Sequence, residues 1–339
     1  MSQSEIAAGS AAGRGPWATA LYRLGRDRAA MAACALLCMI VLASLLAPLY
    51  ATRIAHTDPF QSNVGGEVTI DGQTAPILEP ETGGLGLGVT PIGPTWTKTY
   101  FLGADMQGRD VAARLLYGGR NSLAIAGGAS LICLALAALV GIVAGYFGGI
   151  VDAVLARVLD LVWAFPFLLL TISLSIVLIQ QGIRIGPITI GSDSLLLPML
   201  ILGIGGIPYV ARPVRGQILS LKQSDFVLAA VALGVPDRRI LARDLLPNVA
   251  ATLIVFAPLM LALNVMAEAA LSFLSIGVQP PAASWGTIIQ DGQNLIYTRP
   301  MVAIAPGLAI VLTVIALNVF GDGLRDALDP RAKIRVRAG

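Results

Sequence analysis

The sequence has few residues that could hold a metal ion or form a disulfide bond. Among 339 residues there are three cysteines and one histidine, and only 13% of the residues are charged. Cys34, Cys38 and Cys133 lie within apolar runs, where a thiol usually acts as a small hydrophobe. His56 stands in a polar segment without a nearby cysteine. We therefore expect no disulfide, no metal site and no bound cofactor.

Lysine is also scarce, which bears on enzymatic function. The chain has only Lys98, Lys222 and Lys333, and none of them completes a Gly-x4-Gly-Lys-Ser/Thr loop, the motif that cradles nucleotide phosphates. The apolar runs contain no His, Glu and Asp cluster for a catalytic metal, and Ser and Cys lack a nearby general base. No basic tract indicates nucleic-acid binding. We expect no catalytic residues, so nucleotide hydrolysis would need a separate polypeptide.

Apolar residues are abundant: 56% of the chain is hydrophobic and its mean hydropathy is +0.77. A helix of about 20 apolar residues crosses the hydrocarbon core of a bilayer, which is roughly 30 Å thick. Six such runs predict an all-α integral membrane protein with about six transmembrane helices. They cover residues 29–51, 122–146, 153–179, 194–214, 251–274 and 301–320. Prolines are expected to kink these helices or mark their ends, at Pro166, Pro198, Pro208, Pro258 and Pro306.

The distribution of Lys and Arg predicts the orientation in the membrane. With the N-terminus inside, the cytoplasmic segments hold 16 of the 23 basic residues, in 1–28, 146–157, 211–250 and 321–339. Basic residues concentrate in cytoplasmic loops, so both termini are expected in the cytoplasm. The run 29–51 is too long for a signal-peptide core and is interpreted as an uncleaved helix. The remaining expected regions are an extracytoplasmic loop with an interfacial helix (52–120), a membrane domain (121–325) and a cytoplasmic tail (326–339).

The expected outer loop contains two local patterns. Residues 66–73 alternate in polarity and include Asp71-Gly72, which favours a short strand and a turn. Further along, charged residues recur at spacings of four to six, so that ion pairs could form on one edge of an interfacial helix leading into the membrane. They are Asp105, Arg109, Asp110, Arg114 and Arg120. We expect these charges to anchor the helix rather than to contact a substrate.

The cytoplasmic segment 225–248 has the pattern of a helix, a glycine break, a second helix and a proline stop. Asp225 can cap the first helix, two alanines favour it, and Gly234 can end it. Asp237 can then cap a second helix, which Pro247 would end. The residues are Asp225, Ala229, Ala230, Gly234, Asp237 and Pro247, with Arg238, Arg239 and Leu246 in the second helix. Such a hairpin between two membrane spans would present a rigid knob to the cytoplasm.

This segment resembles the EAA loop through which ABC importer permeases couple to their ATPases. The matching positions are Ala229, Ala230, Gly234, Leu246 and Pro247. Two positions depart from the motif, because Leu228 replaces its glutamate and Asp244 replaces a late hydrophobic residue. The alternative interpretation is an ordinary amphipathic loop helix.

Further stretches narrow the resemblance to C-type permease subunits of dipeptide and oligopeptide ABC importers. These stretches are residues 101–111, 114–123, 267–281, 284–286 and 321–331. The likeness covers most of residues 20–331 and implies the type I importer permease fold, whereas the loop 57–99 is longer than in the shorter family members. It also implies a place in the bacterial inner membrane, with partners in the lipid bilayer and on both sides of it. They are a homologous second permease, two ABC ATPase subunits and an extracytoplasmic solute-binding protein.

Two polar residues of the fifth predicted span, Asn264 and Glu268, are candidates for the translocation path. An ionisable group in hydrocarbon costs at least about 2.5 kcal/mol, so Glu268 is expected to face the bundle interior or the outer water layer. One hypothesis is that both residues line or support the path. The other is that Glu268 lies near the outer end of its helix and packs at a subunit interface.

Other transported solutes and another class of transporter remain open alternatives. Within the same family, the solute could be nickel, glutathione or another small molecule, because specificity rests largely with the binding protein. Outside it, a self-sufficient secondary transporter would require paired intramembrane charges or broken-helix repeats, and the sequence shows neither. The resemblance therefore favours an ATP-driven importer of peptides.

Overall fold

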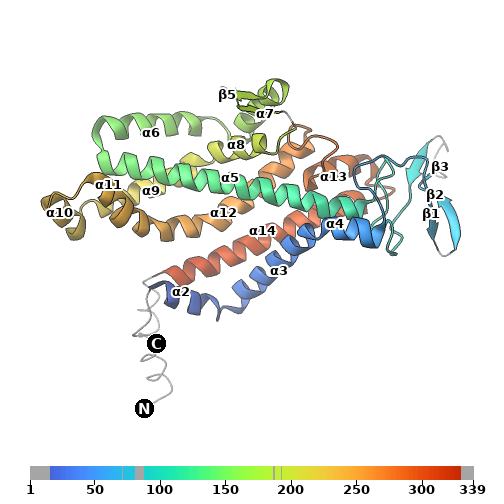
Figure 1. Ribbon diagram of the computed structural model, residues 1–339, viewed down its shortest axis with the longest axis horizontal. Helices are drawn as coiled ribbons and strands as arrows, with labels where there is room; N and C mark the ends of the chain where they lie inside the picture. The colour runs from blue at the N-terminus through green and yellow to red at the C-terminus, as the bar shows by residue number, and fades with distance from the viewer. Residues whose placement is uncertain (1–15, 71, 81–87, 186–187, 192, 330–339) are drawn as a thin grey trace, which may run out of the picture.

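The computed structural model describes residues 16–70, 72–80, 88–185, 188–191 and 193–329, which form an elongated helical molecule (Figure 1). The long helices are α3 (Arg28–Leu45), α5 (Val111–Phe147), α6 (Gly149–Ala164), α7 (Phe167–Gln181), α8 (Leu196–Gly205), α9 (Ile207–Leu221), α12 (Leu246–Phe273) and α14 (Met301–Leu328). Shorter helical elements are α2 (Pro16–Leu24), α4 (Ala47–Leu49), η1 (Tyr50–Ala55), α10 (Asp225–Ala232), α11 (Asp237–Arg239), η2 (Ile240–Leu245), α13 (Trp285–Gly292) and η3 (Gln293–Leu295). Antiparallel hairpins join β1 (Glu67–Ile70) to β2 (Gln73–Pro76), β3 (Leu78–Pro80) to β4 (Val89–Pro91) and β5 (Ile183–Ile185) to β6 (Ile188–Ile190).

Six membrane spans can be built from the described helices. Four stretches are long and apolar enough by themselves, namely α3, α5, Asp237–Phe273 and α14. Two bent pairs supply the others, since α6 and α7 meet at 88° and α8 and α9 at 44°. The predicted all-α membrane fold with about six spans is confirmed. The predicted run 153–179 is broken at Pro166, where a proline kink or helix end was expected, so that it divides into α6 and α7. Proline disfavours helical backbone in the residue before it, and Phe165 is accordingly extended ahead of Pro166, with φ −89° and ψ 136°.

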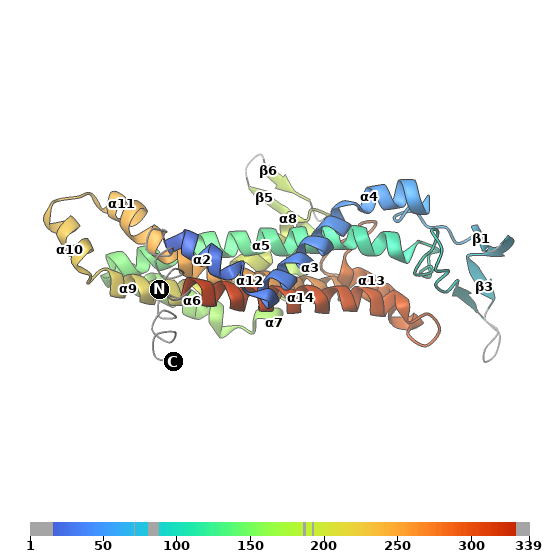
Figure 2. The same cartoon turned by 90° about the horizontal axis from the view of Figure 1, so that it is seen from below.

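The central helix α5 packs against α3, α8, α9 and α12 and runs along most of the bundle (Figures 1 and 2). Its 37 residues correspond to about 55 Å of helix. The helix begins where the Asp110 carboxylate accepts a hydrogen bond from the amide of Ala112 at 2.9 Å. Close packing with α9 depends on a small residue, because a Cβ on Gly141 would lie 2.7 Å from Val214.

The two ends of the molecule carry different structures. The elements α10 and α11 project at one end, and the hairpins β1–β2 and β3–β4 lie at the other (Figure 1). The expected N-terminal tail contains α2, which packs beside the last turns of α14, where Arg23 Nη1 donates to the Asp329 carbonyl at 3.4 Å. Residues 1–15 of that tail and residues 330–339 of the expected C-terminal tail lie outside the described residues.

The outer region confirms one local prediction and corrects another. Glu67–Ile70 is the expected short strand, and it pairs with a second strand, Gln73–Pro76. Asp71 of the expected turn lies outside the described residues. No separate interfacial helix exists among the described residues between 88 and 120. Asp105 accepts hydrogen bonds from the amides of Gln107 and Arg109, and Gly108 has φ +72°, so this segment forms a turn rather than a helix. The later charges belong to the start of α5.

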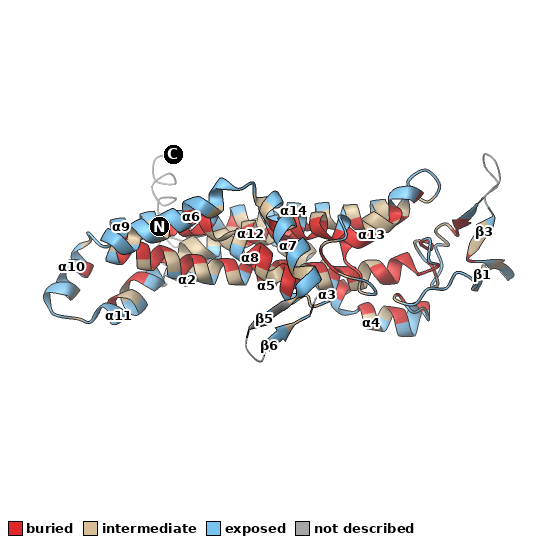
Figure 3. Ribbon diagram, turned by 90° about the horizontal axis from the view of Figure 1, so that it is seen from above, coloured by how far each residue is buried: buried red, intermediate tan, exposed pale blue. Residues whose placement is uncertain are grey.

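Much of α6 and α7 is exposed (Figure 3), and many of the exposed residues are large and apolar. Ile150, Leu161, Leu169 and Val177 are examples of this exposed apolar surface. A soluble protein would not leave so much contiguous apolar surface in water. Lipid or neighbouring membrane helices must therefore cover this side of the bundle.

Candidate functional site

The segment 225–248 forms the hairpin at the α10 end of the molecule (Figure 1). The helix α10 has eight residues and is followed by Gly234, whose φ of +72° lies in the left-handed region that other residues rarely adopt. The amide of Val235 donates to the Ala230 carbonyl at 3.0 Å, which closes the helix end. Ala229 and Ala230 lie within α10, and Arg238 and Arg239 lie in α11, so the expected helix and glycine break are present.

The predicted capping roles in this hairpin are wrong at three positions. Ser224 occupies the N-cap position of α10, while Asp225 is its first residue, where a negative charge favours the helix dipole. Asp237 is the first residue of α11 rather than its cap. Pro247 ends no helix, because it stands in the first turn of α12, directly after the π-helical turn η2. Residues 237–273 therefore continue from the hairpin into the membrane.

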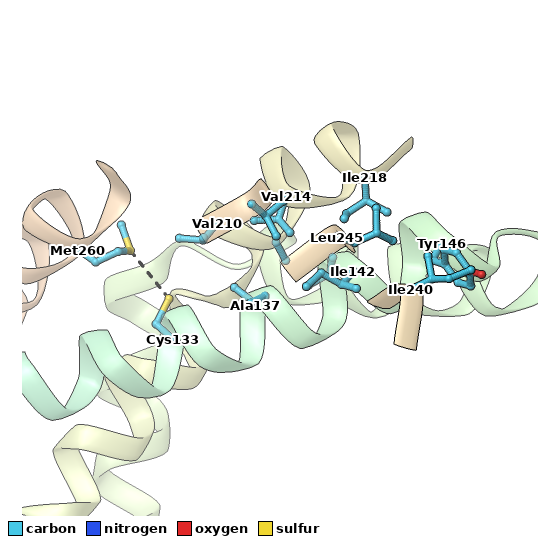
Figure 4. Packing of buried hydrophobic residues seen from close by; sticks show 14 of the residues in the cluster. Cys133, Ala137, Ile142, Tyr146, Val210, Val214, Ile218, Ile240, Leu245 and Met260 are labelled. Carbon is cyan, nitrogen blue, oxygen red and sulfur yellow. Dashed lines mark hydrogen bonds between the residues drawn. The ribbon is translucent and has the colours of Figure 1, made fainter. Parts of the chain in front are cut away.

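Buried apolar residues fix the hairpin to the bundle (Figure 4). Val227 of α10 and Ile240 and Leu245 of η2 are at most 1% exposed. They belong to one hydrophobic cluster that also contains Ile142 of α5 and Ile218 of α9. Burial of a large aliphatic side chain contributes about 1.5–3 kcal/mol, so this cluster makes the hairpin and the bundle one packed unit.

Hydrogen bonds through Tyr146 strengthen the same junction. The Tyr146 hydroxyl donates to the Asp237 carboxylate at 2.6 Å, and Lys222 Nζ donates to the Tyr146 carbonyl at 2.6 Å. The Lys222 ammonium also lies 5.6 Å from the centre of the Tyr146 ring. The sequence has no local signal for these contacts, because Tyr146 and Asp237 are 91 residues apart.

The free face of the hairpin is apolar. Phe226, Leu228 and Val231 are about half exposed, and Leu233 is 82% exposed. Since the hairpin lies beyond the long membrane helices, such a patch is typical of a protein–protein contact. Leu228, which replaces the glutamate of the EAA motif, belongs to this free face and not to the core. Arg238 and Arg239 are exposed in α11, and Leu246 and Pro247 at the start of α12.

A second candidate region is a cavity of about 580 Å³ between the two bent helix pairs and α12. Its lining is mainly aromatic and aliphatic, and Trp163 and Tyr209 stack across it with ring centres 6.2 Å apart. Asn264 contributes an amide to the lining, and its Nδ2 donates to Ser130 Oγ at 2.9 Å. The break at Pro166 is the sequence signal that could have indicated a cavity here, because bent helices leave space beside the bend.

Glu268, one turn beyond Asn264, does not line this cavity. Its side chain is fully buried, and Oε1 accepts a hydrogen bond from Ser272 Oγ at 2.7 Å. No hydrogen-bond partner reaches Oε2 among the described residues. The neighbouring helix α13 packs closely on this part of α12, where a Cβ on Gly286 would lie 2.3 Å from the Ala269 carbonyl oxygen. Asn264 and Glu268 thus lie in different surroundings.

The charged residues before and within α5 form a buried ion-pair cluster. Arg109 Nε is 2.7 Å from the Asp105 carboxylate, and Arg109 and Arg114 both contact Asp291 of α13, at 2.8 and 2.9 Å. The predicted anchoring ion pairs are therefore present, but the sequence has no signal for Asp291, which lies 182 residues from Arg109. Arg120 instead lies over the Tyr117 ring.

Asp110 forms a separate polar junction at the same end. Its carboxylate accepts hydrogen bonds from the Thr57 hydroxyl and the Tyr100 amide, at 3.1 and 3.2 Å. Burial raises the pKa of the Asp110 carboxyl above its usual value, although the hydrogen bonds oppose that shift. Within the part of the chain that the structure describes, no group of three or more His, Cys, Asp or Glu side chains could hold a metal ion.

A multi-pass helical bundle with an anchored docking hairpin at one end and a cavity between bent helices is typical of a membrane transport subunit. The chain belongs to the family described as binding-protein-dependent transport system inner membrane component, whose model matches residues 137–334. The model of the N-terminal transmembrane domain of oligopeptide transport permease C matches residues 15–67. The chain is thus a multi-pass inner-membrane permease, and its resemblance to C-type peptide permeases is confirmed.

Curated relatives agree with this family. The chain is 36% identical to the glutathione transport system permease protein of Pectobacterium atrosepticum, over 70% of this chain and 74% of the relative. It is 32% identical to the oligopeptide transport system permease protein of Haemophilus influenzae, over 94% of this chain and 90% of the relative. The second match includes the outer region as well as the membrane helices.

The fold also matches a solved transporter. A chain of the MetNI methionine ABC transporter, in an inward-facing conformation, aligns with 64% of this chain and 96% of its own length. The TM-score is 0.50 and the sequence identity is 19%. This likeness confirms the ABC importer permease fold and carries no further conclusion.

Proposed function

We propose that the chain is the permease subunit of an ATP-driven importer for dipeptides or oligopeptides. In this proposal it forms the translocation path with a homologous second permease, two ABC ATPase subunits supply the energy, and an extracytoplasmic solute-binding protein delivers the peptide. The family and the oligopeptide permease relative support this assignment. The observation that carries it is the hairpin 225–248, which is anchored in the bundle and apolar on its free face.

In the proposed orientation, the hairpin and both chain ends are cytoplasmic. The helix α2 and the end of α14 lie toward the α10 end of the molecule, away from the β1–β2 hairpin (Figure 1). Arg23 lies in α2, Arg26 follows that helix, and Arg28 is the first residue of α3. Arg325 lies in the last turn of α14. Basic residues at one end of the spans favour the cytoplasmic side for that end.

The hairpin converts ATPase movement into rearrangement of the helices. Closure of the ATPases would push on the free face formed by Phe226, Leu228, Val231 and Leu233. Because Val227 and its neighbours pack into the cluster of α5 and α9, the push would move packed helices rather than a loose loop. The permease pair would then rock between inward-open and outward-open states, which is alternating access.

The cavity beside Asn264 is the proposed part of the translocation path within this chain. An aromatic and aliphatic wall with few polar groups suits peptide side chains of varied shape better than it suits one polar solute. Glu268 supports the path indirectly, as a buried residue that positions α12 against α13. In this proposal Asn264 lines the path, and Glu268 supports it without lining it.

Reconstitution tests this function. The chain would be incorporated in proteoliposomes with the proposed second permease, ATPases and binding protein, and uptake of labelled dipeptide would be measured. We expect uptake that requires ATP and every subunit, and no ATP hydrolysis by the chain alone. Uptake without ATP would contradict the proposal and favour a secondary transporter.

Glutathione is the second candidate solute, because a glutathione permease is 36% identical to this chain over 70% of its length. The same proteoliposomes would be supplied from outside with labelled glutathione and with Ni²⁺ in parallel. Peptide uptake that glutathione does not inhibit would support the first assignment. Preferential glutathione uptake would support the second while keeping the importer class.

A further inference from the structure

The outer turn formed by residues 95–101 holds an aromatic side chain in an exposed position. Trp96 and Tyr100 have φ values of +54° and +55°, in the left-handed region that aromatic residues rarely adopt. The Thr95 hydroxyl donates to the Thr99 carbonyl at 2.7 Å and stabilises the turn. Trp96 is nevertheless 61% exposed, with its ring edge-on to Phe101 at 5.3 Å between centres. The fold therefore keeps a strained backbone and leaves the indole uncovered.

This turn forms one wall of a cleft of about 560 Å³. The opposite walls come from η1 and from the first turns of α5, through Tyr50, Ile54 and Leu116. The walls are therefore aromatic and aliphatic. Lys98, one of the three lysines in the sequence, also lines the cleft and is exposed.

The position of the cleft relative to the bilayer follows from α3. Its 18 residues correspond to about 27 Å of helix, close to the hydrocarbon thickness of a membrane. The helix α4 follows the end of α3 (Figure 2). Tyr50 and Ile54 lie in η1 directly after it, so the cleft that they line lies at the outer boundary of the bilayer. Leu42, Leu45 and Leu49 are exposed along α3 and α4, which makes the apolar membrane surface continuous with the cleft.

We propose that this cleft binds an outer-leaflet phospholipid. An acyl chain would lie against Ile54 and Leu116, the Trp96 indole would sit at the level of the lipid ester groups, and the Lys98 ammonium would contact the phosphate. Tryptophan and tyrosine favour this depth because each has an apolar ring and a polar group, and lysine extends toward headgroups. An anionic headgroup would be preferred, since a cation near the surface attracts anionic lipid.

Lipid quenching of tryptophan fluorescence tests the depth and the charge preference. The full chain and its Trp96→Phe variant would be reconstituted in vesicles of equal parts phosphatidylcholine and phosphatidylglycerol, with bromine near the top of the acyl chain of one lipid at a time. We expect the emission lost in the variant to be quenched severalfold more by brominated phosphatidylglycerol than by brominated phosphatidylcholine. Lys98→Gln should remove that preference. An unchanged far-UV circular dichroism spectrum would show that each variant is folded.

The outcomes against the proposal are distinct. Equal quenching by the two lipids would overturn the role of Lys98, and quenching of the Trp96 component by aqueous iodide alone would overturn lipid binding. A photoreactive benzoyl-phenylalanine at exposed Thr97, in the membrane-embedded protein with its natural partners, should form a phospholipid adduct. The matched control is exposed Gln73 on the β1–β2 hairpin, which should form none. An adduct of Thr97 with another polypeptide would show that a protein occupies the cleft.

Discussion

The two ends of α5 are held to their neighbours by different physical means. At the α10 end, the hairpin 225–248 is anchored by apolar burial of Val227, Ile240 and Leu245, with hydrogen bonds through Tyr146 at its edge. At the other end, buried ion pairs join the start of α5 to α13 through Arg114 and Asp291. Apolar anchoring tolerates small changes, whereas a buried charge that loses its partner is costly. The outer end should therefore be more sensitive to single substitutions.

The largest expected effect is that of Arg114→Ala. The change leaves Asp105 buried with one fewer cation, and loss of one partner from a buried ion pair costs about 3–5 kcal/mol. Thermal unfolding of the detergent-solubilised protein and protease cleavage of the outer region would measure the loss. The control is Arg120→Ala, because Arg120 is exposed and should change stability little. Equal stability of the two variants would show that the ion-pair cluster does not hold the outer end.

Gly234→Pro should be next in size and should act on transport. Proline cannot adopt φ +72°, and it removes the amide that donates to the Val231 carbonyl, at a local cost of about 3 kcal/mol. We expect peptide uptake in the reconstituted importer to fall to background while membrane insertion stays normal. Gly216→Ala is the control, since an added Cβ there meets open space. Full uptake by the Gly234→Pro variant would remove the coupling role of the hairpin.

Tyr146→Phe should produce a smaller effect at the same end. It removes one hydrogen bond to the exposed Asp237, for which about 1 kcal/mol is expected. A double-mutant cycle with Asp237→Ala, read by unfolding and by coupling of ATP hydrolysis to uptake, would isolate this interaction. A coupling energy near zero would mean that the apolar cluster alone anchors the hairpin.

Leu228→Ser should have the smallest effect on folding. The side chain is 55% exposed, so unfolding should change by no more than about 0.5 kcal/mol. Association with the ATPase subunits should weaken by about fivefold, or ~1 kcal/mol, because an apolar contact of the free face is lost. Val64→Ser, equally exposed at the opposite end, should leave this association unchanged. Equal binding by both variants would place the ATPase contact elsewhere.

Much of the fold could be predicted because its signals are local. Hydrophobic length indicates the spans, and Gly234 after a run of helix-favouring residues indicates the end of α10. Even so, the prediction that Pro247 ends a helix was wrong, because proline occurs both after a helix and in its first turn. The structure selects the first turn, since Leu245 is buried and the chain continues as helix directly into α12.

The candidate path shows where sequence spacing is insufficient. Asn264 and Glu268 are four residues apart and therefore lie on similar faces of one helix. Asn264 nevertheless lines the cavity beside the bent pairs, whereas Glu268, one turn further along the helix, lies where α12 packs against α13. Spacing on a single helix indicates direction, but neighbours supplied by distant segments determine what lies in that direction.

The sequence by itself determined that this protein crosses a membrane about six times, favoured one orientation through its basic residues, and placed a helical hairpin between two spans. Those properties depend on hydrophobic length, charge position and turn-forming residues, all of which act over short stretches of chain. Only the tertiary structure decided that Asp291 completes the cluster of Arg109 and Arg114, that Tyr146 meets Asp237, and that the bend at Pro166 opens a cavity. These contacts join residues far apart in the chain, so they exist only once the helices have packed.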